Sequence, residues 1–237
     1  MESIPSHSAR DYLERLRTDR RVAQAWETLG SSLALAGSDK LLRTLLVCST
    51  QPQEGKTTVA THLAMVAALA GERVLLVDAD LRRPRLHTLF GIPIECGFAD
   101  LLEGRAAFAD VARPFDLGAD ARGALHVVPS GAGSAASVPL LASQQLADVV
   151  AALGANADKV IFDSPPALSV SDALFLAPAV DGVVFVVGAG EVAKREAVLA
   201  KERIANSGAR LLGFVMNRFD DAKHGPGYHP YHAYYEG

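Results

Sequence analysis

LLVCSTQPQEGKTT, residues 45–58, joins an apolar run to a helical pattern that continues to residue 70. A strand that leads through a Gly-Lys-Thr turn into a helix is the layout of a phosphate-binding loop, because the turn's N–H groups and the helix N-terminus attract anions. In such a loop the lysine reaches the β- and γ-phosphates and the threonine hydroxyl binds Mg²⁺. The segment predicts binding of ATP or GTP, and the residues expected to bind the nucleotide are Gln53, Glu54, Gly55, Lys56, Thr57 and Thr58.

The loop pattern is incomplete, because Thr50 stands where the full pattern has its first glycine. A glycine N-cap followed by a surface lysine would give the same triplet. Two further apolar runs favour the phosphate-binding interpretation: residues 74–77 lead to Asp78 and Asp80, and residues 160–162 lead to Asp163. Runs that are apolar on both faces are typical of central parallel strands, whose carboxyl ends bind ligands. We therefore expect the three clusters at one edge of one sheet.

Composition limits the class of protein. A chain of 237 residues, 49% hydrophobic and 21% charged, is typical of one α/β domain with short extensions. The net charge of −4 provides no basic field, so nucleic acid is not an expected partner. The two cysteines, Cys48 and Cys96, form no disulfide framework and indicate a reducing compartment. Neither a leader nor a membrane span is expected, because no apolar stretch reaches about 18 residues.

The alternation of strand and helix patterns predicts a P-loop α/β fold, with a mostly parallel sheet flanked by helices. Strands are expected at 44–49, 73–77, 125–129, 159–163, 182–187 and 211–217, and helices at 9–35, 56–70, 143–153, 171–176 and 193–206. Residues 119–123 and 130–137 are expected to be mobile small-residue loops near the rim of the site. The expected organisation is a helical extension at 1–38, a nucleotide-binding domain at 39–219 and a flexible tail at 220–237.

The tail holds four of the five tyrosines, Tyr228, Tyr231, Tyr234 and Tyr235. Three interpretations are open: the tyrosines are aromatic anchors, neighbours of a histidine metal site, or phosphoacceptors. Each phosphate adds about 1.5 to 2 negative charges, so four would change the tail by about −6 to −8. That change exceeds the formal charge of the whole chain, which favours an electrostatic switch.

Together, the loop, the paired-aspartate strand, the Asp-Ser-Pro-Pro strand end at 163–166 and the tyrosine tail resemble the bacterial tyrosine autokinases of capsule and exopolysaccharide synthesis. The resemblance covers about residues 40–220 and the tail, and residues 75–84 are its most specific stretch. It implies transfer of phosphate from Mg²⁺-bound ATP to the tail tyrosines. It also implies a cytoplasmic chain, recruited to the inner face of the plasma membrane by a membrane-anchored co-polymerase that activates it, and a tyrosine phosphatase that reverses the reaction.

The resemblance and the loop chemistry give the aspartates and the loop distinct roles. Lys56 would neutralise the β- and γ-phosphates, and Thr57 would bind Mg²⁺ together with Asp163 and Asp78. Asp78 would also orient and deprotonate the incoming tyrosine, and Asp80 would complete the outer shell of the metal. Phosphoryl transfer needs positioning and charge neutralisation more than covalent help.

Two further pairs of residues are expected at the rim. Asn217 and Arg218, after the last strand, would line the adenine side of the site. Arg82 and Arg83 either steer a phosphotyrosine or an activator, or are solvated surface charges.

The chain departs from the family pattern in two places. The Glu-x-x-Arg-x-x-Arg motif of the N-terminal helix, which builds a ring in many members, is replaced by Gln24, Glu27 and Gly30. A homo-oligomer would therefore need other contacts. The Asn-Pro-x-Glu-Leu-Leu segment is represented by residues 137–141, which lack its glutamate.

Two rival functions remain. A spatial-organising ATPase of the chromosome- and septum-positioning class carries a second lysine in the loop, where this chain has Gln51. A nucleotide-binding scaffold without kinase activity would explain the altered N-terminal motif. Phosphate on the tail separates the kinase from both rivals.

Overall fold

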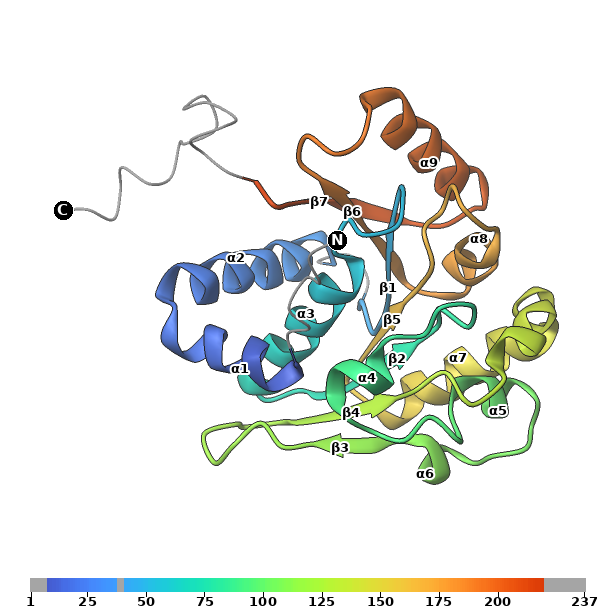
Figure 1. Ribbon diagram of the computed structural model, residues 1–237, viewed down its shortest axis with the longest axis horizontal. Coiled ribbons are helices and arrows are strands. Elements are labelled where there is room, and N and C mark those ends of the chain that lie inside the picture. Colours follow the sequence, from blue (N-terminus) through green and yellow to red (C-terminus); the bar gives the residue numbers. More distant parts are fainter. Residues whose placement is uncertain (1–7, 38–40, 220–237) are drawn as a thin grey trace, which may run out of the picture.

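Seven strands form one sheet in the order β3-β4-β2-β5-β1-β6-β7 (Figure 1). The computed structural model describes residues 8–37 and 41–219. Every neighbouring pair of strands is parallel except β3 and β4, which are antiparallel. The strands are β1 Thr44–Ser49, β2 Arg73–Asp78, β3 Arg113–Phe115, β4 Ala124–Val128, β5 Lys159–Asp163, β6 Gly182–Gly188 and β7 Leu211–Asn217. The predicted fold class is confirmed, and only the short edge strand β3 was missed.

Helices cover both faces of the sheet, as the apolar strands require (Figure 1). Along β1, Leu45 and Val47 enter the core beneath α1, α2, α3 and α4, whereas Leu46 and Cys48 enter the core beneath α5, α7, α8 and α9. The helices are α1 Ala9–Thr18, α2 Arg20–Ala36, α3 Lys56–Ala70, α4 Leu86–Phe90, α5 Phe98–Leu102, α6 Phe108–Val111, η1 Ser134–Ala142, α7 Gln144–Asn156, α8 Asp172–Leu176, η2 Ala177–Ala179 and α9 Lys194–Asn206. The short helices α4, α5 and α6 were not predicted, although α8, which is equally short, was.

The prediction of one helix over 9–35 is wrong, because the chain breaks at Asp19 into α1 and α2. The backbone of Asp19 is extended, and its carboxylate accepts N–H bonds from Arg21 and Val22 at 3.0 and 3.3 Å. An aspartate at this position competes with the helical hydrogen bonds and caps a new helix. Val22, Trp26, Leu29 and Leu33 of α2 recur at helical spacing and form an apolar stripe that packs on the core beneath α3.

The prediction of a mobile loop over 130–137 is wrong in its second half. Ser134 begins the 3₁₀ helix η1, and its buried hydroxyl donates to the Leu81 carbonyl at 2.9 Å. This hydrogen bond joins η1 to the segment after β2. The predicted tail at 220–237 lies outside the described residues.

Helix length gives one further result. In the ranges 8–37 and 41–219, no single helix has the length and apolar composition to cross a membrane. The bent pair η1 and α7, which meet at 99°, passes the same test only when the two helices are taken together.

An aromatic cluster attaches the N-terminal helices to α3. The His62 ring stacks on Trp26, with ring centroids 4.5 Å apart, and lies 4.8 Å from the Tyr12 ring. Its Nδ1 lies 2.8 Å from the Thr58 carbonyl, and the Tyr12 hydroxyl lies 3.3 Å from the Thr58 hydroxyl. α1 and α2 therefore contact the first turn of the helix that follows the Gly-Lys-Thr turn.

Acid should weaken this attachment. Burial lowers the pKa of His62 below its usual 6.5, and the charge of Arg15 lowers it further, against the hydrogen bond to Thr58. The unfolded chain therefore takes up a proton near pH 6.5 that the folded chain resists, and folding stability is lost as the pH falls through that value. We expect the difference in unfolding free energy between the parent and His62→Gln to shrink from pH 7.5 to pH 5 in urea titrations. A constant difference would contradict the expectation.

Candidate active site

The Gly-Lys-Thr turn connects β1 to α3 and has the backbone of an anion-binding loop. Gly55 caps α3 in the left-handed conformation, with φ of +91°. The Asn217 amide, at the end of β7, donates to the Glu54 carbonyl at 2.8 Å. A Cβ at position 55 would lie 2.0 Å from Asn217 Nδ2, so glycine is required by both conformation and space.

Glu54 holds this loop from within. Its side chain is buried, and its two oxygens accept N–H bonds from Gln51 at 2.5 Å and from Gly188, at the end of β6, at 3.0 Å. The carboxylate of Glu54 therefore anchors the loop to the sheet, and the predicted role of Glu54 in nucleotide binding stays a prediction. Gln53 is exposed, with φ of +71°.

Gly55→Ala should lower nucleotide affinity. The left-handed conformation costs an L-residue about 1–2 kcal/mol, and the new methyl group also displaces Asn217. We expect a loss of at least about tenfold in the affinity for a fluorescent ADP analogue, which corresponds to about 1.4 kcal/mol. Gly104→Ala is the matched control, because φ there is +69° and no atom lies within 4 Å of the added Cβ. Equal losses in the two variants would mean that the lower affinity reflects general backbone strain and is not specific to the loop at Gly55.

Lys56 lies between two aspartates at the carboxyl ends of the central strands. Its Nζ is 3.5 Å from Asp80 Oδ2 and 3.8 Å from Asp163 Oδ1, and the Thr57 hydroxyl donates to Asp163 Oδ2 at 2.7 Å. Burial opposes the charge of Lys56, but Asp163, Asp80 and Asp78 outweigh it and raise the lysine's pKa. Burial raises the pKa of Asp163, whereas Lys56 and Thr57 lower it, and the net shift is upward. The sheet thus gathers one cation, one hydroxyl and several carboxylates in a nearly dry space.

Asp78 is fully buried and lies opposite Asp163 in the β2–β5 register. Its Oδ2 accepts N–H bonds from Arg85 and Leu86, both at 2.9 Å, and its Oδ1 accepts one from Asp80 at 3.3 Å. Burial, followed by the charge of Asp163, raises the pKa of Asp78 to about 7, against the two N–H bonds at Oδ2. Asp78 therefore shapes the segment after β2, and its predicted roles toward metal and tyrosine stay predictions.

Two buried side-chain oxygens beside the loop, Thr50 Oγ1 and Asp163 Oδ1, have no hydrogen-bond partner among the residues that the structure describes. A carboxylate oxygen that faces Lys56 at 3.8 Å but accepts no hydrogen bond, beside a threonine hydroxyl, suits Mg²⁺, which prefers oxygen ligands. Across the described ranges, no group of three histidine, cysteine, aspartate or glutamate side chains is arranged to hold a metal alone. The residues therefore fit an ion that takes its other ligands from water and phosphate.

The rim residues differ in their contacts. Asn217 touches the loop itself, whereas the Arg218 guanidinium donates to Glu191, so Arg218 is tied to the segment before α9. Arg82 donates twice to Asp172 of α8, at 2.8 and 3.2 Å. The sequence does not single out Asp172 as a partner of Arg82, because an isolated aspartate at the start of a helix is usually interpreted as an N-cap.

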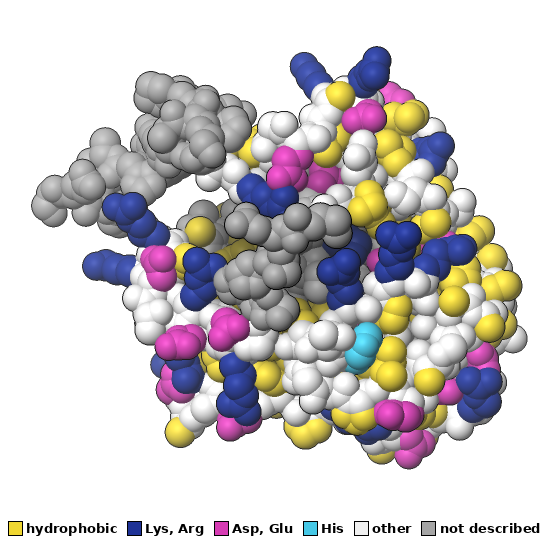
Figure 2. All heavy atoms as spheres, viewed as in Figure 1, with side chains coloured by type: hydrophobic (Ala, Val, Ile, Leu, Met, Phe, Trp, Pro, Cys, Tyr) yellow, Lys and Arg dark blue, Asp and Glu magenta, His cyan; other side chains and the backbone are white. Residues whose placement is uncertain are grey.

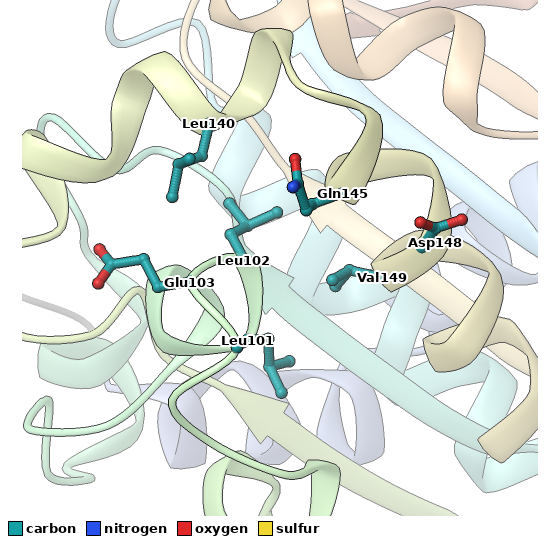
Figure 3. A pocket seen from close by; sticks show the side chains of 8 residues that line it. Leu101, Leu102, Glu103, Leu140, Gln145, Asp148 and Val149 are labelled. Carbon is teal, nitrogen blue, oxygen red and sulfur yellow. The ribbon is translucent and has the colours of Figure 1, made fainter.

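A separate open hollow of about 530 Å³ lies between α5, η1 and α7 (Figure 3). Leu102, Leu140 and Val149 supply its apolar wall, and the carboxylates of Glu103 and Asp148 lie on its two sides (Figure 3). Glu103 also accepts a hydrogen bond from Ser137, in the segment that lacks the family glutamate. The hollow contains no residue of the loop or of the aspartate cluster, so the candidate site is the cluster at Lys56.

Comparisons with known proteins agree with this geometry. Residues 45–234 match the CobQ/CobB/MinD/ParA nucleotide binding domain family. Tyrosine-protein kinase YwqD of Bacillus subtilis is 34% identical over 202 residues, which are 85% of this chain and 83% of YwqD. The chimerical protein CapA2B2 superposes with a TM-score of 0.79 at 28% identity, over 92% of each chain. The kinase domain of the Escherichia coli tyrosine kinase ETK gives 0.77 at 27% identity, over 93% of this chain and 84% of that domain.

The fold, the loop and the match over residues 45–234 define a P-loop nucleotide-binding protein of the CobQ/CobB/MinD/ParA class. Within that class, the identity to YwqD and the superposition on ETK give the narrower assignment. This chain belongs to the family of bacterial tyrosine kinases.

Proposed function

We propose that this chain is an autokinase that transfers the γ-phosphoryl group of ATP to Tyr228, Tyr231, Tyr234 and Tyr235 of its own tail. The observation that carries the proposal is the position of Lys56 between Asp80 and Asp163, at the start of the loop helix, in a member of a tyrosine-kinase family. This cluster suits phosphoryl transfer, which depends on positioning and charge neutralisation.

Each residue of the cluster would have a separate role in phosphoryl transfer. Lys56 would exchange its contact with Asp80 Oδ2 for one with the β- and γ-phosphates. Asp80 Oδ2 would then be available to the tyrosine hydroxyl, while Asp80 Oδ1 keeps its hydrogen bond from the Arg83 N–H. A free tyrosine has a pKa near ~10, so a nearby carboxylate helps to orient and deprotonate it. The sequence assigns this role to Asp78, but the contacts favour Asp80, because both Asp78 oxygens already accept backbone N–H bonds.

Thr57 and Asp163 are the residues that would hold Mg²⁺. The Thr57 hydroxyl and Asp163 Oδ1, which has no hydrogen-bond partner among the described residues, would supply the protein's ligands, and Glu54 keeps the loop in place around them. The bound ion would supply positive charge to the phosphate oxygens. Gly55 and the first turn of α3 would bind the phosphates, and Asn217 would border the base.

The physiological setting is also a proposal. The chain would act in the cytoplasm, at the inner face of the plasma membrane, where a membrane-anchored co-polymerase recruits and activates it for capsule or exopolysaccharide synthesis. Resemblance to the chimerical protein CapA2B2 supports a two-part arrangement of this kind. A tyrosine phosphatase would reset the tail. Self-association would use contacts other than the arginine motif, since Gln24 and Glu27 are exposed on α2 in its place.

The test is the mass of the purified chain after incubation with ATP and Mg²⁺, with tandem fragmentation to locate each phosphate. The proposal predicts a ladder of phosphates confined to the four tail tyrosines, and none in a variant that ends at Phe219. If no phosphate is added, even with the cytoplasmic segment of a membrane partner present, a nucleotide-binding scaffold or a positioning ATPase becomes the better description.

A further inference from the structure

Three arginines follow β2 at the edge of the sheet that carries the candidate site. Arg82 is committed to Asp172 through two hydrogen bonds. Arg83 and Arg85 are exposed, and neither guanidinium has an acceptor among residues 8–37 and 41–219. Arg83 and Arg85 are therefore two cations that have no ion-pair partner in the described part of the chain.

The site itself holds these two arginines in place. Asp80 Oδ1 accepts the Arg83 N–H at 3.0 Å, and Asp78 Oδ2 accepts the Arg85 N–H at 2.9 Å. Asp80 also contacts Lys56, so the backbone of both arginines is tied to groups that line the transfer site.

The surface agrees with this arrangement. Figure 2 shows Lys and Arg side chains gathered right of centre, where Figure 1 places the loop between β2 and α4. The whole chain carries a net charge of −4, so this positive area runs against the overall balance. A local field of that kind attracts negatively charged partners and aligns them as they bind.

We propose that Arg83 and Arg85 form an acceptor subsite, which binds an anionic side chain next to the tyrosine that is phosphorylated. This inference rests on the proposed kinase function, because the subsite needs a tyrosine to position. The anion is either a carboxylate or a phosphate already present on a neighbouring tyrosine, and arginine binds both in a forked geometry.

The subsite would give the tail an order of modification. Tyr234 and Tyr235 lie beside Glu236, whereas Tyr228 and Tyr231 have only glycine, proline, histidine and alanine nearby. The first phosphates would therefore appear on Tyr234 or Tyr235. Each phosphate would then supply the anion for the next tyrosine, so that modification proceeds toward Tyr228.

A binding assay tests the subsite without relying on catalysis. The peptides span residues 228–237 and carry fluorescein and a C-terminal amide. Each has a single tyrosine, and the other tyrosine positions are changed to phenylalanine. The peptides are titrated into the full chain with Mg²⁺ and ADP. The chain carries Tyr→Phe changes at its four tail tyrosines, which remove competition from its own acceptors. Three peptides are compared, each with Tyr234 as the acceptor: one with Glu236, one with Gln at that position, and one with Gln there and a phosphotyrosine at position 235, on the same side of the acceptor as Glu236.

The parent should bind both anionic peptides about tenfold more tightly than the neutral one, and 0.5 M salt should remove most of the difference. Arg83→Gln combined with Arg85→Gln should abolish the preference, and Arg83→Lys with Arg85→Lys should restore part of it. Arg122→Gln is the matched control, because Arg122 is exposed near the opposite ends of the strands. Equal binding of all three peptides by the parent, or an equal effect of Arg122→Gln, would overturn the subsite.

Phosphate transfer to the same peptides separates this inference from the kinase proposal. Selective binding without any transfer would retain the subsite and reject the kinase function. Transfer at equal rates to all three peptides, with no preference in binding, would retain the kinase and reject the subsite. A preference for the phosphotyrosine peptide alone would assign the site to phosphate.

Discussion

Lys56→Met should reduce the rate of tail phosphorylation by at least about 10³-fold, because removal of one preorganised cation from a phosphoryl-transfer site has effects of this order. Methionine keeps the length and the apolar stem of lysine, so the loss reports the charge. The change also leaves Asp80 and Asp163 without their shared cation, and the nucleotide-free protein should become less stable. The measurements are phosphate incorporation by quenched-time mass spectrometry and urea unfolding without nucleotide.

Lys159→Met is the matched control for this prediction. Lys159 also pairs with a carboxylate, Glu72, at 2.9 Å, but it lies at the start of β5, at the opposite end from the candidate site. We expect the rate of transfer in Lys159→Met to stay within about twofold of the parent, as a partly exposed ion pair contributes little. Retention of more than a tenth of the parent rate in Lys56→Met would remove Lys56 from the transfer step.

Asp163→Asn should reduce the rate by about 10²- to 10³-fold, which is the usual effect of removing one charged group that acts in the transition state. Its effect on stability should be opposite to that of Lys56→Met. Three carboxylates face one lysine here, and burial raises the pKa of both Asp78 and Asp163. Conversion of Asp163 to a neutral amide relieves this excess, and the amide oxygen can still accept the Thr57 hydrogen bond.

The two variants together separate function from folding. Without nucleotide at pH 8, where an ionised Asp163 is most costly, Asp163→Asn should unfold at the same or a higher urea concentration than the parent. Addition of Mg²⁺ and ADP should stabilise the parent and have little effect on the variant. Asp158→Asn is the control, since Asp158 is exposed and pairs with Arg73 before the same strand. A less stable Asp163→Asn would mean that the carboxylate is a net stabilising group.

The strands and the loop could be predicted from sequence because each depends on local pattern. The apolar runs at β1, β2, β5 and β6 are buried on both faces, and short runs of this kind are typical of central parallel strands. The break at Asp19 and the 3₁₀ helix at Ser134 could not be predicted, since both depend on a competing side-chain hydrogen bond. For Ser134 the partner is the carbonyl of Leu81, which lies 53 residues away in the chain.

Glu54 and Asp78 show why the site could be located but not interpreted. Both lie next to residues of the expected chemistry, and the sequence treats them as participants. The sheet supplies partners from other strands or segments, Gly188 for Glu54 and the Arg85 and Leu86 N–H groups for Asp78. A buried carboxylate must be hydrogen-bonded, so these contacts set what each side chain is able to do.

The sequence by itself determined that this is a P-loop α/β protein, and that Lys56, Thr57, Asp80 and Asp163 meet at one edge of its sheet. Those properties follow from periodicity and from the common direction of parallel strands. Only the tertiary structure decided which carboxylates accept backbone N–H bonds and that Arg82 is paired with Asp172. It also decided that neither the Arg83 nor the Arg85 guanidinium has an acceptor in the part of the chain that the structure describes. The physical reason is that hydrogen-bond partners are allotted between segments distant in sequence, and only folding brings those segments together.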